Sequence, residues 1–363
     1  MLDFRLDDEQ QMLTDAIARY ANERVRKVFR DAEEEDVIPP DVVQAGWDIG
    51  VLPTSIPEKF GGFGEYSAVT GAVAIEEFAW GDLAIMLNVM TPNLVAIPLM
   101  LCGTDAQKEA YLPLFADEKM PPLTAALTEP VIQFNPYQLK TTAVRDGDNY
   151  ELNGTKTLVP LVEEADLILV YAEENGQTQA FLVPADIPGV TVGSRDRLMG
   201  IHALPTYSVT FSEVCVPLAN KLGGEEGSDF DLILVHSRVA LGAAAVGMAR
   251  AGFEYARDYA KQRVQFGEPI GHRQSIAFML ADMATDVDEA RLMVWETAWL
   301  LDQGQDAMRE ATVMKHHIDG LAVNVADRAL QILGGYGYIR EYPVELWLRN
   351  ARGFSTFDGL AMI

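Results

Sequence analysis

Two features near the end of the chain could carry chemistry: a glycine-rich stretch and a carboxylate that follows it. The stretch Gln331–Tyr338 (QILGGYGY) brings a helical run to Gly334 and Gly335, which stop a helix and let a ligand approach bare backbone. Asp358 follows about twenty residues later, in an Asp-Gly dipeptide that is typical of a turn. Glycine-rich backbone with one placed carboxylate indicates a phosphate-bearing ligand and a proton acceptor.

Metal and disulfide chemistry are not expected from the remaining candidate residues. His316 and His317 are adjacent, so on a helix they point to different faces, whereas a metal-binding pair needs a spacing of three or four residues. Cys102 and Cys215 lie far apart and in no metal or redox spacing. Two isolated cysteines agree with a reducing compartment.

The composition indicates an acidic globular protein. With 363 residues the chain can form more than one packed unit, because single cores rarely grow beyond about 250–300 residues. Its 28 Lys and Arg residues against 54 Asp and Glu residues give a net charge of −26, which repels nucleic acid and anionic membranes. The first residues show no basic region leading into an apolar core, so we expect no secretory signal and a cytoplasmic location. The most apolar window, Leu83–Leu101, is broken by polar residues and prolines, which indicates buried core.

The hydrophobic pattern predicts three parts that must position the candidate residues, in an α+β fold. Residues 1–119 read as helices, with a long one over Ser67–Trp80. Residues 120–222 change to short alternating runs, in which Asn153-Gly154 predicts a hairpin turn. Residues 223–363 return to helices, which are expected over Phe230–Ala260, Ser275–Gln303 and Met308–Leu333.

Segments spread over nearly the whole chain resemble the acyl-CoA dehydrogenase family, in the order of that family. They are Pro57–Gly64, Leu127–Pro130, Leu152–Lys156, Met199–Pro205, Tyr259–Ile270, Leu280–Met283 and Gln331–Tyr338. The resemblance implies an N-terminal helical domain, a middle β-barrel or sandwich and a C-terminal four-helix bundle. It also implies FAD as cofactor, an acyl-CoA thioester as substrate and α,β-dehydrogenation as reaction. Electron-transfer flavoprotein is then an expected partner.

The resemblance assigns cofactor contacts to two of these segments. Arg263 would place its guanidinium on the FAD pyrophosphate, where a bidentate fork suits phosphate oxygens. Gly334 and Gly335, directly after the helical run Met308–Leu333, would admit the same dinucleotide close to the backbone. In the family these residues reach the FAD that is held mainly by a neighbouring subunit. The expected cofactor contacts are Arg263, Gln265, Phe266, Gln331, Gly334 and Gly335.

The segments that hold a subunit's own flavin depart from the family pattern. The family follows Thr-Glu-Pro with x-Ala-Gly-Ser-Asp, whereas here Gln133 replaces the glycine and Phe134 a hydroxyl. Leu158 stands where the family has the Trp that covers the flavin ring. Pro160 replaces a Thr whose N–H and hydroxyl meet the flavin N5 edge, and proline has neither donor. Flavin polar atoms buried without partners would cost roughly 1–3 kcal/mol each.

The catalytic end is altered as well. Asp358, at the position of the family's catalytic Glu, is one methylene shorter, and a displacement of about 1 Å at a reacting atom can lower a rate about a hundredfold. Some relatives carry the Glu instead on the long helix, where this chain has Ser237. Arg238, beside it, matches an Arg that family members place near the acyl-CoA.

The chain keeps the residues that reach a neighbour's FAD and departs from the family pattern in the segments that hold its own flavin and base. This combination resembles the non-catalytic subunit of heteromeric acyl-CoA dehydrogenases, such as the actinobacterial enzymes for steroid side chains. The resemblance implies an α2β2 assembly in which the chain completes the FAD site of a catalytic homologue. Two alternatives stay open. One is a self-sufficient flavoenzyme with Asp358 as base, and the other is a cofactor-free scaffold, against which the retained Arg263 argues.

Overall fold

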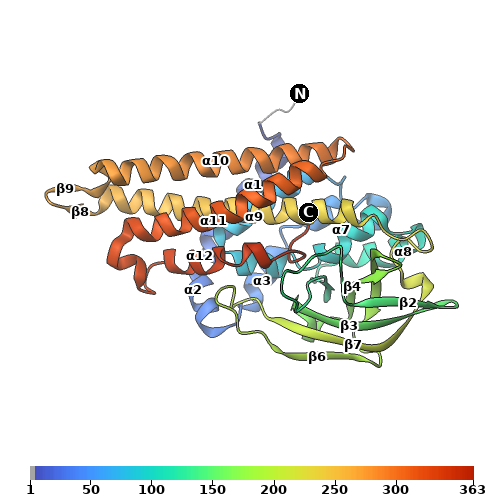
Figure 1. Ribbon diagram of the computed structural model, residues 1–363. Coiled ribbons are helices and arrows are strands. Elements are labelled where there is room, and N and C mark those ends of the chain that lie inside the picture. Colours follow the sequence, from blue (N-terminus) through green and yellow to red (C-terminus); the bar gives the residue numbers. More distant parts are fainter. Residues whose placement is uncertain (1–4) are drawn as a thin grey trace.

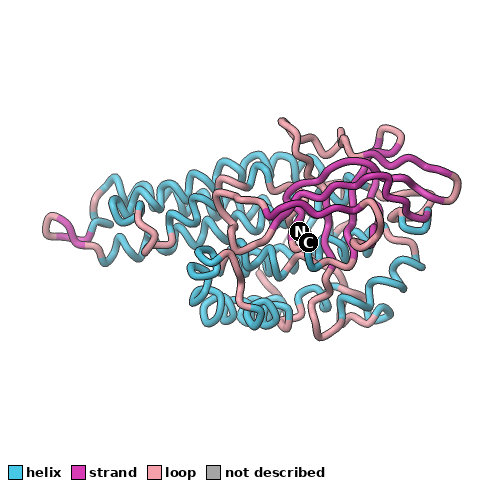
Figure 2. Tube along the Cα trace, turned by 90° about the horizontal axis from the view of Figure 1, so that it is seen from below, coloured by secondary structure: helices cyan, strands magenta, loops and turns pink. Residues whose placement is uncertain are grey.

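The computed structural model describes residues 5–363. Residues 1–4 lie outside the described residues. They begin the N-terminal segment in which no secretory signal is expected. A helical part, a β part and a second helical part follow one another along the chain, so the predicted α+β order is confirmed (Figure 1). The sheet lies at one end of the long C-terminal helices (Figures 1 and 2). The boundaries drawn at residues 119 and 222 stay predictions.

The N-terminal part consists of short helices that surround two apolar ones. Its helices are α1 (Asp8–Tyr20), α2 (Arg26–Glu35), α3 (Pro40–Trp47), α4 (Val51–Ser55), α5 (Ala68–Gly81), α6 (Leu83–Val89), α7 (Asn93–Cys102) and α8 (Asp105–Tyr111). α1 begins with a capping box, in which the Asp7 carboxylate accepts a hydrogen bond from the Gln10 backbone N–H. The window predicted to be buried core forms α6 and α7, and residues 83–99 are all buried.

The middle part is one hydrogen-bonded sheet of seven strands. Its strands are β1 (Leu123–Ala126), β2 (Thr142–Asp146), β3 (Asn149–Pro160), β4 (Leu167–Glu174), β5 (Gln177–Pro184), β6 (Val190–Arg195) and β7 (Thr206–Pro217). The order is β1-β4-β2-β3-β7-β6, with β5 also paired to β4. β3 and β7 pair over most of their length, which places the end of β3 beside the connection from β6 to β7.

The prediction of a hairpin turn at Asn153-Gly154 is wrong. β3 runs through this dipeptide, and the turn lies earlier, at Gly147 between β2 and β3. The dipeptide marks a register shift in the β3–β7 ladder. Gly154 has φ +151°, and a Cβ there would lie 2.5 Å from the Thr141 Cα, so the glycine permits close strand packing. Local sequence could not reveal this contact with another strand.

The C-terminal part is a bundle around a long central helix. Its helices are α9 (Phe230–Gln262), α10 (Gln274–Asp302), α11 (Met308–Leu333) and α12 (Val344–Ala351). α9 packs against α5, α10 and α11, and Gly247 permits close approach because a Cβ there would lie 2.1 Å from the Glu76 carbonyl oxygen. By length and composition α9 could cross a membrane, as could the bent α6–α7 pair taken as one span, but 89% of the most apolar window of α9 is buried inside the fold.

The connections of this bundle bring two helix ends together. α9 and α11 run in the same direction because α10 lies between them in the chain, so their C-terminal ends meet far from the sheet (Figure 1). A small hairpin of β8 (Val264–Gln265) and β9 (Glu268–Pro269) joins α9 to α10 at this end. A 3-10 turn, Gly334–Tyr338, follows α11.

Candidate functional site

Five of the six residues expected to contact a cofactor line one hollow, which we call the α9–α11 hollow. They are Arg263, Gln265, Phe266, Gly334 and Gly335. The hollow measures about 800 Å³ and lies between the β8–β9 hairpin and the end of α11. Its other walls are largely apolar or aromatic, from Tyr259, Ile270, Ile276, Ile332, Leu333, Tyr336 and Ile339, and they include Arg273, which pairs with Glu268 at 3.1 Å. The sixth residue, Gln331, is exposed on α11 and lies outside the lining.

Arg263 supplies an unpaired cation to this hollow. It follows α9, and its backbone N–H donates to the Tyr259 carbonyl at 2.8 Å. Its guanidinium carbon lies 5.2 Å from the centre of the Tyr336 ring, and no carboxylate among residues 5–363 pairs with it. A partly exposed guanidinium with free N–H groups suits phosphate oxygens. These residues therefore fit the pyrophosphate and adenosine half of a dinucleotide such as FAD.

Aromatic side chains around the α9–α11 hollow are left exposed. Phe266, at the tip of the hairpin, is 94% exposed, and Tyr338, on the turn after α11, is 87% exposed. Phe266 also has φ +53°, a left-handed conformation that is uncommon for a bulky residue. Exposed apolar groups and strained backbone both concentrate where a protein contacts another molecule.

The two glycines after α11 differ in what their own chain requires of them. Gly334 has φ +59° and ψ −129°, which a side chain would strain, so it is needed to end the helix. A Cβ at Gly335 would meet nothing within 4 Å in the described chain. Packing inside residues 5–363 therefore does not explain the glycine at 335, whereas a ligand close to the backbone would.

The Thr-Glu-Pro and Asn-Gly-x-Lys segments meet in a buried ion pair. The Lys156 ammonium donates to Glu129 Oε1 at 2.9 Å, and both side chains are almost fully buried. Glu129 also accepts from the backbone N–H groups of Lys140 (2.7 Å) and Thr141 (2.8 Å). Burial lowers the pKa of Lys156 to about 8. Burial alone would raise the pKa of Glu129, but Lys156 and the two N–H groups outweigh it, so that pKa lies below its usual value. Neither residue was among the candidates that the sequence motifs indicated.

Pro160, where the family has the Thr that meets the flavin N5 edge, offers no donor to a flavin. Pro160 is buried, has no N–H, and its carbonyl already accepts from the Thr124 hydroxyl at 2.6 Å. Leu158, at the family's Trp position, has φ +54° and packs against the main core. These residues do not fit an isoalloxazine ring as the family pattern would.

Little free space remains beside Ser237, the position where some relatives carry the catalytic Glu. A cavity of about 10 Å³ remains beside Ser237 and Gly359, with Tyr171 and Met362 in its wall; we call it the Ser237 cavity. This volume holds about one water molecule, whereas ligand pockets measure several hundred Å³. Phe134, which replaces a small hydroxyl in the family pattern, packs against the same apolar cluster.

Residues 360–363 are buried, and Met362 among them lines the Ser237 cavity. All are 4% exposed or less. The Met362 carbonyl accepts from the Asn93 amide at 3.2 Å, and the Ile363 carbonyl accepts from the Tyr66 hydroxyl at 3.0 Å. A Cβ at Gly71 would lie 3.1 Å from the Ile363 Cβ, so α5 is also in close contact with this segment.

Asp358 lies next to a lysine that the sequence analysis did not single out. Its Oδ1 atom is buried without a hydrogen-bond donor in the described chain and lies 3.8 Å from the Lys315 ammonium. Lys315 donates to both oxygens of Asp319 at 2.8 and 2.7 Å. Burial raises the pKa of Asp319, and the Asp358 charge adds to this shift. The i, i+4 spacing of Lys315 and Asp319 was a usable signal. Gly359 lines the Ser237 cavity, but Asp358 does not.

Arg238 does not line the Ser237 cavity either. Its guanidinium donates to the Thr312 hydroxyl at 2.7 Å and lies 3.5 Å from the Met308 sulfur, both on α11. The expected acyl-CoA contact of Arg238 stays a prediction.

A helical domain, a sheet domain and a helical bundle in this order, with a dinucleotide-sized hollow at the bundle end, define a flavoprotein dehydrogenase architecture. Family models described as the N-terminal, middle and C-terminal domains of acyl-CoA dehydrogenase match residues 7–119, 124–214 and 231–362. The chain belongs to the acyl-CoA dehydrogenase family, whose members bind FAD and dehydrogenate acyl-CoA thioesters.

Full-length relatives support this assignment. An acyl-CoA dehydrogenase of Bacillus subtilis is 35% identical, over 97% of this chain and 94% of that protein. The CarC subunit of the caffeyl-CoA reductase-Etf complex of Acetobacterium woodii is 32% identical, over 98% of this chain and 96% of that protein. The structure of butyryl-CoA dehydrogenase from Megasphaera elsdenii superposes with a TM-score of 0.90 at 30% identity, covering 99% of this chain and 96% of that one.

Proposed function

We propose that this chain is the non-catalytic subunit of a heteromeric acyl-CoA dehydrogenase. In this proposal it forms an α2β2 complex with a catalytic homologue. One observation carries the proposal: the α9–α11 hollow measures about 800 Å³, whereas the Ser237 cavity measures about 10 Å³. The residues proposed to contact a neighbour's dinucleotide line an open hollow. At the place proposed for the chain's own acyl group, almost no free volume remains.

In this proposal the chain contributes the contacts that complete a neighbour's FAD site. The FAD, when bound, accepts the hydride from the acyl-CoA in the catalytic subunit. Arg263 would balance pyrophosphate charge, and Phe266 would exclude water from the dinucleotide. Gly335 would admit it close to the backbone. Gln265, Gln331 and Gly334 belong to the same proposed contact surface, which is exposed in the single chain.

The same proposal makes Asp358 a structural charge. Its carboxylate and that of Asp319 together surround Lys315, which lies 8% exposed. A buried ammonium needs such partners, because an uncompensated charge in a protein interior is strongly destabilising. A general base must reach the proton it removes, and Asp358 lies outside the lining of the Ser237 cavity.

The test uses the chain co-expressed with a catalytic homologue from the same organism, with FAD per complex counted from visible absorbance. Gly335→Ala should leave the chain folded, since the added Cβ meets nothing within 4 Å, yet lower the FAD content. Gly320→Ala is the matched control, because Gly320, which lies on α11, also has open space around it. Arg263→Gln should weaken FAD binding about 10- to 150-fold, since a hydrogen bond to a charged group contributes about 1.5–3 kcal/mol.

The alternatives give different results in the same assays. A chain that purifies alone with stoichiometric FAD and oxidises an acyl-CoA is self-sufficient. Asp358→Asn would abolish that activity, whereas it leaves the activity of the heteromeric complex unchanged. A cofactor-free scaffold keeps the complex's FAD content when Arg263 is replaced. Electron-transfer flavoprotein is the electron acceptor to assay first, because one relative is named as a subunit of an Etf complex.

A further inference from the structure

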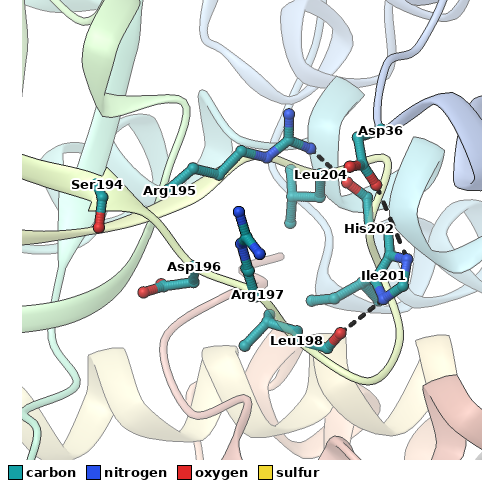
Figure 3. A pocket seen from close by; sticks show the side chains of 9 residues that line it. All are labelled: Asp36, Ser194, Arg195, Asp196, Arg197, Leu198, Ile201, His202 and Leu204. Atoms are coloured by element: carbon teal, nitrogen blue, oxygen red, sulfur yellow. Dashed lines mark hydrogen bonds and ion pairs between the residues drawn. The ribbon is translucent and has the colours of Figure 1, made fainter.

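A second large hollow lies between the connection of β6 to β7 and the end of α2, far along the fold from the α9–α11 hollow. We call it the β6–β7 hollow, and it measures about 860 Å³ (Figure 3). That volume is in the range of small-molecule sites. It is lined by Asp36, Ser194, Arg195, Asp196, Arg197, Leu198, Ile201, His202 and Leu204.

Two guanidinium groups extend into the β6–β7 hollow without a carboxylate partner. Figure 3 shows the side chains of Arg195 and Arg197 reaching into the same space. Arg195 donates to the His202 carbonyl, and no described residue forms an ion pair with it. Arg197 is exposed and has neither a hydrogen bond nor an ion pair within residues 5–363. In a chain with 54 acidic and 28 basic residues, two neighbouring arginines without an acidic partner need another explanation.

The carboxylates near the β6–β7 hollow form no ion pair with Arg195 or Arg197. Asp196 accepts from the Thr206 hydroxyl at 3.0 Å, and Figure 3 shows its carboxylate turned away from Arg197. Asp36 lies 3.8 Å from His202 Nδ1. Glu33, behind His202, accepts from the His202 backbone N–H at 2.8 Å and from Arg349 at 2.6 Å. The arginines therefore keep free N–H groups and positive charge.

The loop that forms one wall is rigidly held in a strained conformation. Ile201 has φ +51°, which is a genuine outlier for a β-branched residue. Its N–H donates to the buried Asn350 amide oxygen at 2.8 Å, and a Cβ at Gly200 would lie 2.5 Å from that oxygen. Arg349 also donates to the Met199 carbonyl at 3.0 Å. Strained backbone fixed by several contacts is a feature of preorganised binding sites.

We propose that the β6–β7 hollow binds a small phosphate-bearing molecule through Arg195 and Arg197. Two arginines that converge on one space provide charge-assisted, planar hydrogen-bond donors, which match phosphate oxygens. The Ser194 hydroxyl offers one further donor. Leu198, Ile201 and Leu204 supply an apolar wall for the rest of the ligand. This site is separate from the α9–α11 hollow and does not depend on the proposed function.

The experiment compares purified wild-type chain with Arg197→Gln, using inorganic phosphate and ADP as probes. Line broadening of the probes' ³¹P resonances reports binding, and calorimetric titration with ADP gives its affinity. Arg197 has no hydrogen bond or ion pair to lose within the described chain, so the variant should fold normally, which far-UV circular dichroism checks. Arg19→Gln, an exposed arginine on α1, is the matched control.

We expect Arg197→Gln to weaken binding of the probes about tenfold or more, in line with a lost hydrogen bond to a charged group, while Arg19→Gln binds like wild type. Broadening by both probes indicates that phosphate alone is recognised, and broadening by ADP only indicates a nucleotide site. The proposal is overturned if wild type binds neither probe, or if Arg197→Gln binds them as wild type does.

Discussion

Replacing Met362 by alanine tests whether the acyl position is closed by residues 360–363. Met362 is 3% exposed and lines the Ser237 cavity, whose volume is about 10 Å³. Burial of a methionine side chain contributes about 1.5–3 kcal/mol. The cavity left behind adds to this loss, so Met362→Ala should lower the free energy of unfolding by about 2–5 kcal/mol.

The assay is urea unfolding followed by tryptophan fluorescence. Met199→Ala is the matched control, because Met199 is 59% exposed and its loss should change stability by less than about 0.5 kcal/mol. The enlarged cavity should also bind a small apolar molecule such as benzene and recover part of the stability. If Met362→Ala is as stable as the control, the segment is not packed as described, and the argument for a closed acyl position fails.

Gly154→Ala should destabilise the chain by about 1–3 kcal/mol more than Gly147→Ala, because its Cβ meets Thr141 at 2.5 Å while the space at Gly147 is open; urea unfolding measures both. Burial lowers the pKa of Lys156 from 10.5 to about 8, so between these values the unfolded chain binds more protons than the folded one. Stability should therefore rise with pH from about 8 towards 10.5, and Lys156→Met should remove this contribution in denaturation curves taken across that range.

Sequence patterns predicted what depends on local periodicity. The helices expected over Ser67–Trp80 and Met308–Leu333 correspond to α5 and α11, because their apolar spacing and end signals are local. Asn153-Gly154 is a strong local turn signal, yet β3 runs through it. The conformation of Gly154 is set by contact with Thr141, directly before β2.

The ion pairs and the packing that the sequence did not predict depend on contacts between residues far apart in the chain. Lys315 stands 43 residues before Asp358 (358 − 315), and only the packing of the chain end against α11 brings them to 3.8 Å. Glu129 and Lys156 likewise pair across two segments. The closing of the acyl position depends on residues 360–363, whose apolar types alone do not show where they pack.

The gathering of the expected cofactor residues follows from bundle topology. α9 and α11 are parallel, so motifs at their two C-terminal ends meet at the α9–α11 hollow. Helix C-termini carry partial negative charge, which disfavours a phosphate. The chain's net charge of −26 adds to that repulsion. Both effects oppose the binding of a pyrophosphate at this end of the bundle. A fixed cation between the two helix ends would offset them. Arg263, directly after α9 and without a carboxylate partner in the described chain, occupies that position. A neutral residue there would leave a hollow of the right size that repels its ligand.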